Sequence, residues 1–249
     1  MQSRISTVVL SVLATFLTVC VNAAVPDYTI FDDILAGNVR NGFVDYDGVA
    51  SDKRFEIFLS QLDSATTDDI ATDNQFFAFY INAYNALAID GILDGYSPKS
   101  AWGRRKFFRK LEFGVLGGSM TLEMIEHERL RPRGDPRIHF AIVCASMSCP
   151  RLLNRAYLPE TIDVQLHEVA RRFVNDPTRN RFDAKRNIAF VSQIFNWFSE
   201  DFEKAGGSVQ KYLARFVDDA EVQDLLRAEE FTLRYEDYDW SLNGYLSED

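Results

Sequence analysis

The sequence predicts an α+β fold, a mostly helical single domain with a small sheet. Several segments repeat apolar residues at helical spacing, whereas only a few short runs are typical of strands. No internal repeat, low-complexity tract or linker rich in Pro and Ser interrupts the chain, which favours one globular domain over residues 24–249. The 20 Phe and 10 Tyr supply the aromatic volume that a large core needs.

The first half of this domain is predicted to surround one buried helix. Residues 75–93 are apolar on nearly every face, which is typical of a central helix, and Asp73 is its expected N-cap. Glycines and Pro98 end the pattern. The preceding elements are a short helix over 28–35, a short strand over 43–46 and an amphipathic helix that carries Phe55, Phe58, Leu59 and Leu62.

The second half alternates short strands and amphipathic helices. Residues 138–143 form an apolar run that predicts a buried strand, and Ser192 is the expected cap of an aromatic-rich helix. The remaining elements are helices near 121–130, 158–174, 208–216 and 219–228 and strands over 188–191 and 231–235.

Composition limits the kinds of partner. The chain has 37 acidic and 27 basic residues, for a formal net charge of −10. Nucleic-acid binding needs basic surface to displace counterions, and anionic membranes attract basic segments, so both are disfavoured. One basic patch stands out at residues 99–112, with Trp102, Phe107 and Phe108 between its charges. Two interpretations stay open: a loop whose aromatics pack inward, or a contact for an anion or a partner.

The N-terminus predicts export. Residues 5–21 are an apolar run after Arg4, and small residues follow where a signal peptidase cleaves. We therefore expect a signal peptide over residues 1–23, a periplasmic or secreted protein, and no membrane span after cleavage. Cys20 leaves with the signal peptide, so the mature chain keeps Cys144 and Cys149.

Cys149 is the centre of the candidate site. Pro150 follows it, and proline is favoured at the first position of a helix, so Cys149 is expected at a helix N-terminus, where its thiol pKa would be lowered. The hypothesis is thiol-dependent acyl transfer or amide hydrolysis. In it Cys149 attacks, His139 moves the proton, Glu126 orients the imidazole and Asn85 donates to the oxyanion.

Other interpretations of these residues stay open. Cys144 and Cys149 are five positions apart in a chain expected in an oxidising compartment, so they could form a structural disulfide or a reversible one, or remain two inert thiols. His139 is equally compatible with the core, and Glu126 with an ordinary helix surface. The ligand-type residues lack a dense metal-binding spacing, so no metal and no cofactor is predicted.

Several motifs, in order, make the chain resemble domain-of-unknown-function family 547. They are Tyr80-x-Asn82-x-Tyr84-Asn85-Ala86, Ile125-Glu126-His127 with Leu130-Arg131, His139 with Ser148-Cys149-Pro150, Phe195-x-Trp197-x-x-x-Asp201-Phe202, and Tyr238-Asp239-Trp240-x-Leu242-Asn243. The resemblance covers roughly residues 43–243. It implies that Asn82, Asn85, Glu126, His127, Arg131, His139 and Cys149 are candidate site residues, with Asn82, His127 and Arg131 as binding residues.

Two functions from different classes follow. The leading hypothesis is the thiol-dependent enzyme, with a fold distantly similar to cysteine peptidases or transglutaminases, although the order Glu, His, Cys differs from theirs. The alternative is a non-enzymatic periplasmic binding or adaptor domain with a structural Cys144–Cys149 disulfide. Its partner, a small molecule, a peptide or a protein, is not specified by the sequence.

Overall fold

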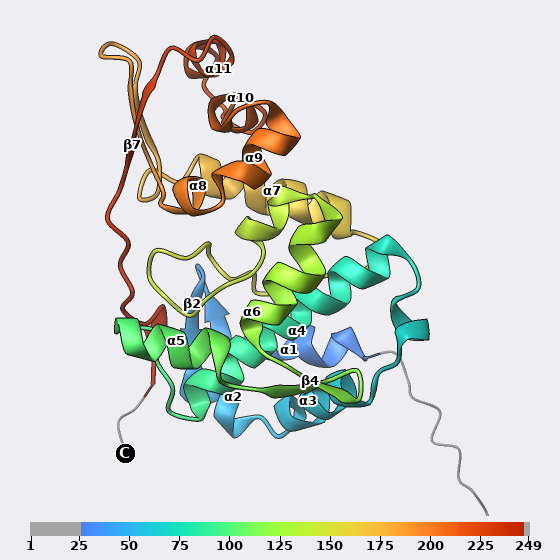
Figure 1. The fold of residues 1–249 in the computed structure, drawn as a ribbon. Helices are drawn as coiled ribbons and strands as arrows, with labels where there is room; N and C mark the ends of the chain where they lie inside the picture. Colours follow the sequence, from blue (N-terminus) through green and yellow to red (C-terminus); the bar gives the residue numbers. More distant parts are fainter. Residues whose placement is uncertain (1–25, 247–249) are drawn as a thin grey trace, which may run out of the picture.

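A computed structural model describes residues 26–246, and Figure 1 shows their arrangement. The predicted signal peptide, together with Arg4 and Cys20, lies outside these residues. The described part is mostly helical with small mixed sheets, which confirms a single α+β domain. The helices α7 to α11 gather at one end of the molecule, the earlier elements at the other, and the segment after β7 returns to the earlier elements (Figure 1).

Helix α4 is the central element, as predicted. It runs over Asp73–Leu93 and is capped by Thr72 rather than by Asp73, because the Thr72 hydroxyl accepts from the Gln75 amide and the Gln75 side chain accepts from the Thr72 amide. By length and composition α4 could cross a membrane, but 83% of its most apolar window is buried inside the protein. Around it stand α1 (Tyr28–Asn38), α2 (Tyr46–Ser51), α3 (Arg54–Ser64) and the 3₁₀ turn η1 (Thr67–Ile70).

Three small sheets replace the single sheet expected. Strands β1 (Val39–Arg40), β2 (Phe43–Asp45) and β8 (Gly244–Tyr245) form the first, β3 (Phe113–Val115) and β4 (Gly118–Met120) the second, and β5 (Arg181–Asp183), β6 (Ile188–Val191) and β7 (Thr232–Tyr235) the third. The parallel pair β2·β8 brings the C-terminal segment against the N-terminal half. Gly244 is required there, because a Cβ would lie 2.0 Å from the Val44 carbonyl oxygen.

The later helices form at the predicted places. The expected helix after Ser192 is divided into α8 (Ile194–Trp197) and α9 (Ser199–Gly206), and the Ser192 hydroxyl accepts from the Ile194 amide. The other helices are α7 (Ile162–Val174), α10 (Val209–Leu213) and α11 (Ala220–Arg227).

The basic patch is a helix rather than a loop. Helix α5 (Ala101–Arg109) begins after Ser100, whose hydroxyl accepts from the Gly103 amide. Phe107 is fully buried, whereas Trp102 is 73% exposed. The aromatic residues of this patch therefore do not all pack inward.

The predicted strand over residues 138–143 is wrong. Asp135 caps a 3₁₀ helix, η4 (Pro136–Phe140), by accepting from the Arg137 amide, and Pro136 sets the first helical φ. An irregular loop follows through Cys149. His139 therefore lies on a 3₁₀ helix and not on the predicted strand.

The helix predicted after Cys149 is also wrong: residues 150–157 follow an irregular path, and side chains rather than helical hydrogen bonds pair with the backbone of residues 156–158. Asn82 pairs with both the amide and the carbonyl of Tyr157. Gln165 accepts from the Leu158 amide and donates to the Ala156 carbonyl. A backbone satisfied in this way has no need of a helix, so Cys149 does not lie at a helix N-terminus.

Candidate functional site

A cavity of about 200 Å³ lies beside the buried loop that carries the two cysteines. Aromatic rings from α4, α5, α8 and the C-terminal segment form most of its wall. One end holds carboxyl and imidazole groups and is called the carboxyl end; the other holds the sulfurs and is called the sulfur end. The lining residues are Tyr84, Phe108, Arg109, Glu123, Glu126, His127, His139, Ile142, Cys144, Cys149, Pro150, Ile194, Trp197, Phe198, Tyr238 and Trp240.

Glu126 and His127 reach the cavity from a π-helical turn. Thr121 caps the short helix α6 (Leu122–Met124), which continues as the π-helical segment η2 (Ile125–Leu130) and the 3₁₀ turn η3 (Arg131–Arg133). Segments of π-helix are rare and occur frequently at functional sites. The helix predicted near 121–130 is thus confirmed, in a less common geometry.

At the carboxyl end, Asp201 of α9 joins two basic side chains. Arg131 donates to both of its carboxylate oxygens, at 2.7 and 3.0 Å, and the His139 Nε2 lies 2.8 Å from Oδ2. Partial burial acts to raise the pKa of Asp201, but the hydrogen bonds from His139 and Arg131 outweigh it and hold that pKa below its usual range. Asp201 is therefore ionised and accepts from both partners.

This pairing fixes the protonation of the two histidines. An ionised carboxylate only accepts, so His139 Nε2 carries the proton. Burial lowers the pKa of His139, with the Asp201 hydrogen bond opposing it, so the ring is neutral near pH 7 and Nδ1 has a free lone pair. A guanidinium only donates, so the His127 Nδ1, 2.7 Å from Arg131 Nη1, is likewise an acceptor.

The free lone pair of His139 has no hydrogen-bond partner among residues 26–246. The His139 side chain is only 1% exposed and stacks on Phe198, with ring centroids 4.0 Å apart. The Glu126 Oε1 atom lies 3.7 Å from Nδ1, beyond hydrogen-bond reach. A buried acceptor without a partner costs about 1–3 kcal/mol of folding free energy.

Glu126 is the second group of the carboxyl end with unusual electrostatics. Its side chain is 13% exposed, and burial raises its pKa from 4.5 to about 7, while Arg131 opposes the shift. Glu126 therefore exchanges its proton near neutral pH. Such perturbed groups in a cavity are typical of functional sites.

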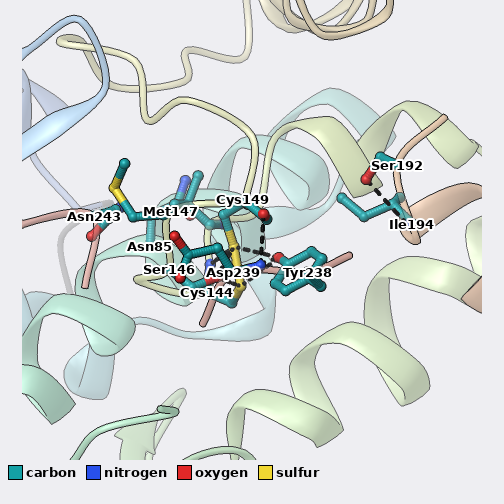
Figure 2. The surroundings of a disulfide bond; sticks show 12 residues. Asn85, Cys144, Ser146, Met147, Cys149, Ser192, Ile194, Tyr238, Asp239 and Asn243 are labelled. Atoms are coloured by element: carbon teal, nitrogen blue, oxygen red, sulfur yellow. Dashed lines mark hydrogen bonds between the residues drawn. A yellow bond between two sulfur atoms is a disulfide. The ribbon is translucent and has the colours of Figure 1, made fainter. Parts of the chain in front are cut away.

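At the sulfur end the polar atoms satisfy one another. Cys144 and Cys149 form a disulfide, shown in Figure 2, and the Tyr238 hydroxyl lies 3.2 Å from each sulfur. The Cys144 amide donates to Cys149 Sγ at 2.9 Å, and the Ser146 hydroxyl lies 3.2 Å from Cys144 Sγ. Burial raises the pKa of Tyr238, which keeps its hydroxyl protonated as a donor. In this disulfide form Cys149 is not a nucleophile.

The C-terminal segment holds the loop between the cysteines. The Met147 amide donates to the Ser241 carbonyl and the Asn243 amide to the Ala145 carbonyl, so residues 145–148 lie along residues 239–243 (Figure 2). Ala145 has a φ of 57°, which is uncommon for a residue other than glycine and occurs where the surroundings enforce it.

The two asparagines of α4 hydrogen-bond the backbone on either side of the cysteine loop. Asn85 donates to the Ala141 carbonyl at 3.0 Å and accepts from the Val143 amide at 2.8 Å, and Asn82 holds Tyr157 in the same manner. Both the oxygen and the nitrogen of the Asn85 amide thus bond backbone groups, and Asn85 is not among the residues that line the cavity, so the predicted donation to an oxyanion there has no support. The geometry gives both asparagines a positioning role.

The sequence-predicted residues therefore converge in part. Glu126, His127, His139 and Cys149 line the cavity, and Arg131 acts on it through Asp201 and His127. The hydrogen bond that orients the His139 imidazole comes from Asp201, not from Glu126 as predicted.

Sequence reasoning missed Asp201 and Tyr238 as site residues. Both stood within quoted motifs, and Asp201 is the acidic position of an otherwise aromatic pattern, which was the available signal. The basic helix α5 also reaches the cavity, since Arg109 lines it and pairs with Glu123 at 2.8 Å. Within residues 26–246, no group of three or more His, Cys, Asp or Glu side chains is placed to hold a metal ion.

Comparison with known proteins gives one match. Residues 69–174 match the family described as "Protein of unknown function, DUF547", so a DUF547 domain lies there. This stretch contains α4, the π-helical turn, His139 and both cysteines, but not Asp201 or Tyr238. No curated protein and no solved structure matches the chain. The expected relationship to cysteine peptidases or transglutaminases has no support.

Proposed function

We propose that this chain is a small-molecule-binding domain and that the cavity between its carboxyl and sulfur ends is the binding site. The observation that carries the proposal is the buried lone pair of His139 Nδ1, which has no partner among the described residues although His139 is one of the residues that line a cavity. The aromatic walls bind an apolar body, and the lone pair accepts from a polar head. This pattern, an apolar pocket with a few polar groups, is typical of ligand sites.

Nuclear magnetic resonance of the histidine nitrogens tests this proposal. The chain has three histidines, and His167 is exposed, which makes it a matched control. We expect the His139 Nδ1 signal to be that of an unprotonated nitrogen and to move on addition of benzylammonium, benzyl alcohol or benzoate, while His167 stays in place. If none of the three probes moves His139, or if His167 moves equally, the cavity is not a binding site.

A second candidate function is thiol-dependent acyl transfer, and one observation favours it. Cys149 borders the same cavity as the proton-accepting nitrogen of His139. A dithiol would first reduce the disulfide and itself be oxidised. The Cys149 thiol would then pass its proton to His139 Nδ1 and attack an ester carbonyl, and the bond to the leaving alcohol would break to give a thioester.

Two matched variants separate this enzyme from the binding domain. Cys144→Ser leaves Cys149 free without any reductant, and Cys149→Ser leaves Cys144 free. With p-nitrophenyl acetate, the acyl-transfer function predicts a burst of about one equivalent of p-nitrophenolate from C144S and none from C149S. Equal bursts from both variants, or none from either, would reject it and leave the binding domain.

Export is proposed together with either function. The support is the apolar run over residues 5–21 with small residues after it. In a bacterial host with a periplasm, we expect the periplasmic fraction to contain a chain whose intact mass corresponds to cleavage after Ala23. A full-length chain confined to the cytoplasm contradicts the proposal.

A further inference from the structure

The carboxyl end of the cavity presents two hydrogen-bond acceptors and no donor between them. His139 Nδ1 has a free lone pair, and Glu126 Oε1 lies 3.7 Å from it. When Glu126 is ionised, both atoms only accept. A group with two or more N–H donors that lies to one side of this pair, within hydrogen-bond distance of both atoms, satisfies both, whereas a carboxylate or a carbonyl satisfies neither.

The walls beside these acceptors favour a positive charge. Six aromatic residues line the cavity: Tyr84, Phe108, Trp197, Phe198, Tyr238 and Trp240. The face of an aromatic ring attracts a cation, and sites for ammonium ligands are built from several such rings. Two of these rings already contact cations, since Arg104 Cζ lies 4.5 Å from the Trp240 ring centroid and Arg131 Cζ lies 5.2 Å from that of Phe198.

One carboxyl group at this end of the cavity has no cation paired with it within the described part of the chain. Three carboxyl groups surround this end, Glu123 from α6, Glu126 from η2 and Asp201 from α9, and two guanidinium groups pair with two of them. Arg109 of α5 pairs with Glu123, and Arg131 pairs with Asp201. The other titratable groups near Glu126 are neutral at pH 7, because burial lowers the pKa of His127 and His139 and raises that of Tyr84 and Tyr238.

We propose that the cavity binds a small organic ammonium ion, whose N–H groups donate to His139 Nδ1 and Glu126 Oε1 and whose apolar body lies among the aromatic walls. This inference rests on the proposed binding function and names its ligand class. The volume of about 200 Å³ suits a body of one ring or a short branched chain, since a 150 Å³ apolar cavity is known to hold benzene.

Without a ligand, a proton on the Glu126 carboxyl group takes the place of the positive charge of the ammonium ion. Burial raises the pKa of Glu126 to about 7, so the carboxyl is half protonated at that pH. The ammonium ion and the proton therefore compete for the same carboxylate. Apparent affinity follows the ionised fraction, so we expect binding to be about tenfold tighter at pH 8 than at pH 6. Near pH 7, where about half of the carboxyl groups are protonated, binding should release about half a proton per ligand.

The experiment uses tryptophan fluorescence with four ring compounds of similar size. The chain has three tryptophans, and Trp197 and Trp240 line the cavity, so Trp102→Phe leaves only these two as reporters. Benzylammonium should bind most tightly. Benzyltrimethylammonium keeps the charge but lacks N–H donors, benzyl alcohol keeps one donor without charge, and benzoate reverses the charge; we expect each to bind at least about tenfold more weakly, the value of one charge-assisted hydrogen bond.

Two variants locate the interaction. Glu126→Gln should weaken benzylammonium binding at pH 8 by at least about tenfold and abolish its dependence on pH. Glu128→Gln, an exposed residue of the same π-helical segment, is the matched control and should change neither. Thermal unfolding of each variant shows that it is folded, and benzyl alcohol binding, which needs no charge, shows that the E126Q cavity is still open.

The outcomes separate this inference from the proposed function. If benzoate or benzyl alcohol binds as tightly as benzylammonium, or if E126Q binds benzylammonium as the parent does, the ammonium assignment is wrong and the binding site stands. If no probe binds, both the proposed function and the inference are wrong.

Discussion

The carboxyl and sulfur ends of one cavity differ in whether their polar atoms are satisfied. At the sulfur end the disulfide, the Tyr238 hydroxyl and the Ser146 hydroxyl are all in mutual contact. At the carboxyl end Asp201 satisfies one nitrogen of His139, and the other nitrogen is left without a partner. A polar network whose hydrogen bonds are all made rigidifies a structure. A buried polar atom without a hydrogen-bond partner is a candidate contact for a ligand. The comparison therefore supports the proposal that the sulfur end has a structural role and that the carboxyl end binds the ligand.

The largest expected effect comes from Asn85, whose side chain hydrogen-bonds the backbone next to the sulfur end. Asn85→Leu leaves the Ala141 carbonyl and the Val143 amide buried without partners, and we expect the free energy of unfolding to fall by roughly 4 kcal/mol. Urea unfolding measures this loss. The exposed amide of Asn196, which bonds only Gln193, provides the control N196L, expected to change stability by less than about 0.5 kcal/mol. A loss below about 1 kcal/mol for N85L would mean that the loop does not depend on this amide.

The second effect tests the carboxyl end through the pH dependence of stability. The pKa of Glu126 is about 7 in the folded chain and near 4.5 when unfolded, so the folded chain binds more protons between these values. The free energy of unfolding contributed by this group therefore falls as pH rises from about 4.5 to 7. Glu126→Gln removes the penalty, and we expect this variant to be more stable than the parent by about 3 kcal/mol at pH 8 and nearly equal to it at pH 4. A stability difference that does not change with pH would contradict the buried, unpaired state of Glu126.

The smallest of the three effects concerns the disulfide. It closes a loop over a sequence separation of 5, and the loop-entropy model assigns it about 2 kcal/mol. Replacing both cysteines by alanine should lower the unfolding free energy by that amount, and dithiothreitol should lower the parent to the same level. The double variant is its own control, because dithiothreitol should leave it unchanged. If the parent is insensitive to dithiothreitol, the structural role of the sulfur end is wrong.

Much of the fold was predictable because its signals are local. The apolar residues of α4 and the amphipathic spacing of α3 and α7 determine helices by their own periodicity. The short run of residues that forms β6 likewise predicts a strand from its own composition. These elements bury one face or all faces according to their pattern, whatever the rest of the chain does.

The errors lie where distant side chains satisfy the backbone. Residues 138–143 have the composition of a strand, yet Asp135 and Pro136 start a 3₁₀ helix, and Asn85, far away in sequence, takes the hydrogen bonds that a neighbouring strand would have taken. Likewise, Asn82 and Gln165 hold the segment after Pro150 in an irregular path. Local propensity does not include such long-range partners.

By itself, the sequence indicated the candidate residues Glu126, His139, Cys144 and Cys149, on a largely helical α+β chain. The tertiary structure alone decided their partners. It paired His139 with Asp201 across 62 positions and left the other nitrogen facing Glu126, because helix α9 packs its acidic face against η4. It also brought Tyr238 onto the disulfide through the return of the C-terminal segment. Hydrogen bonding and burial depend on distances in space, and periodicity along a chain does not encode those distances.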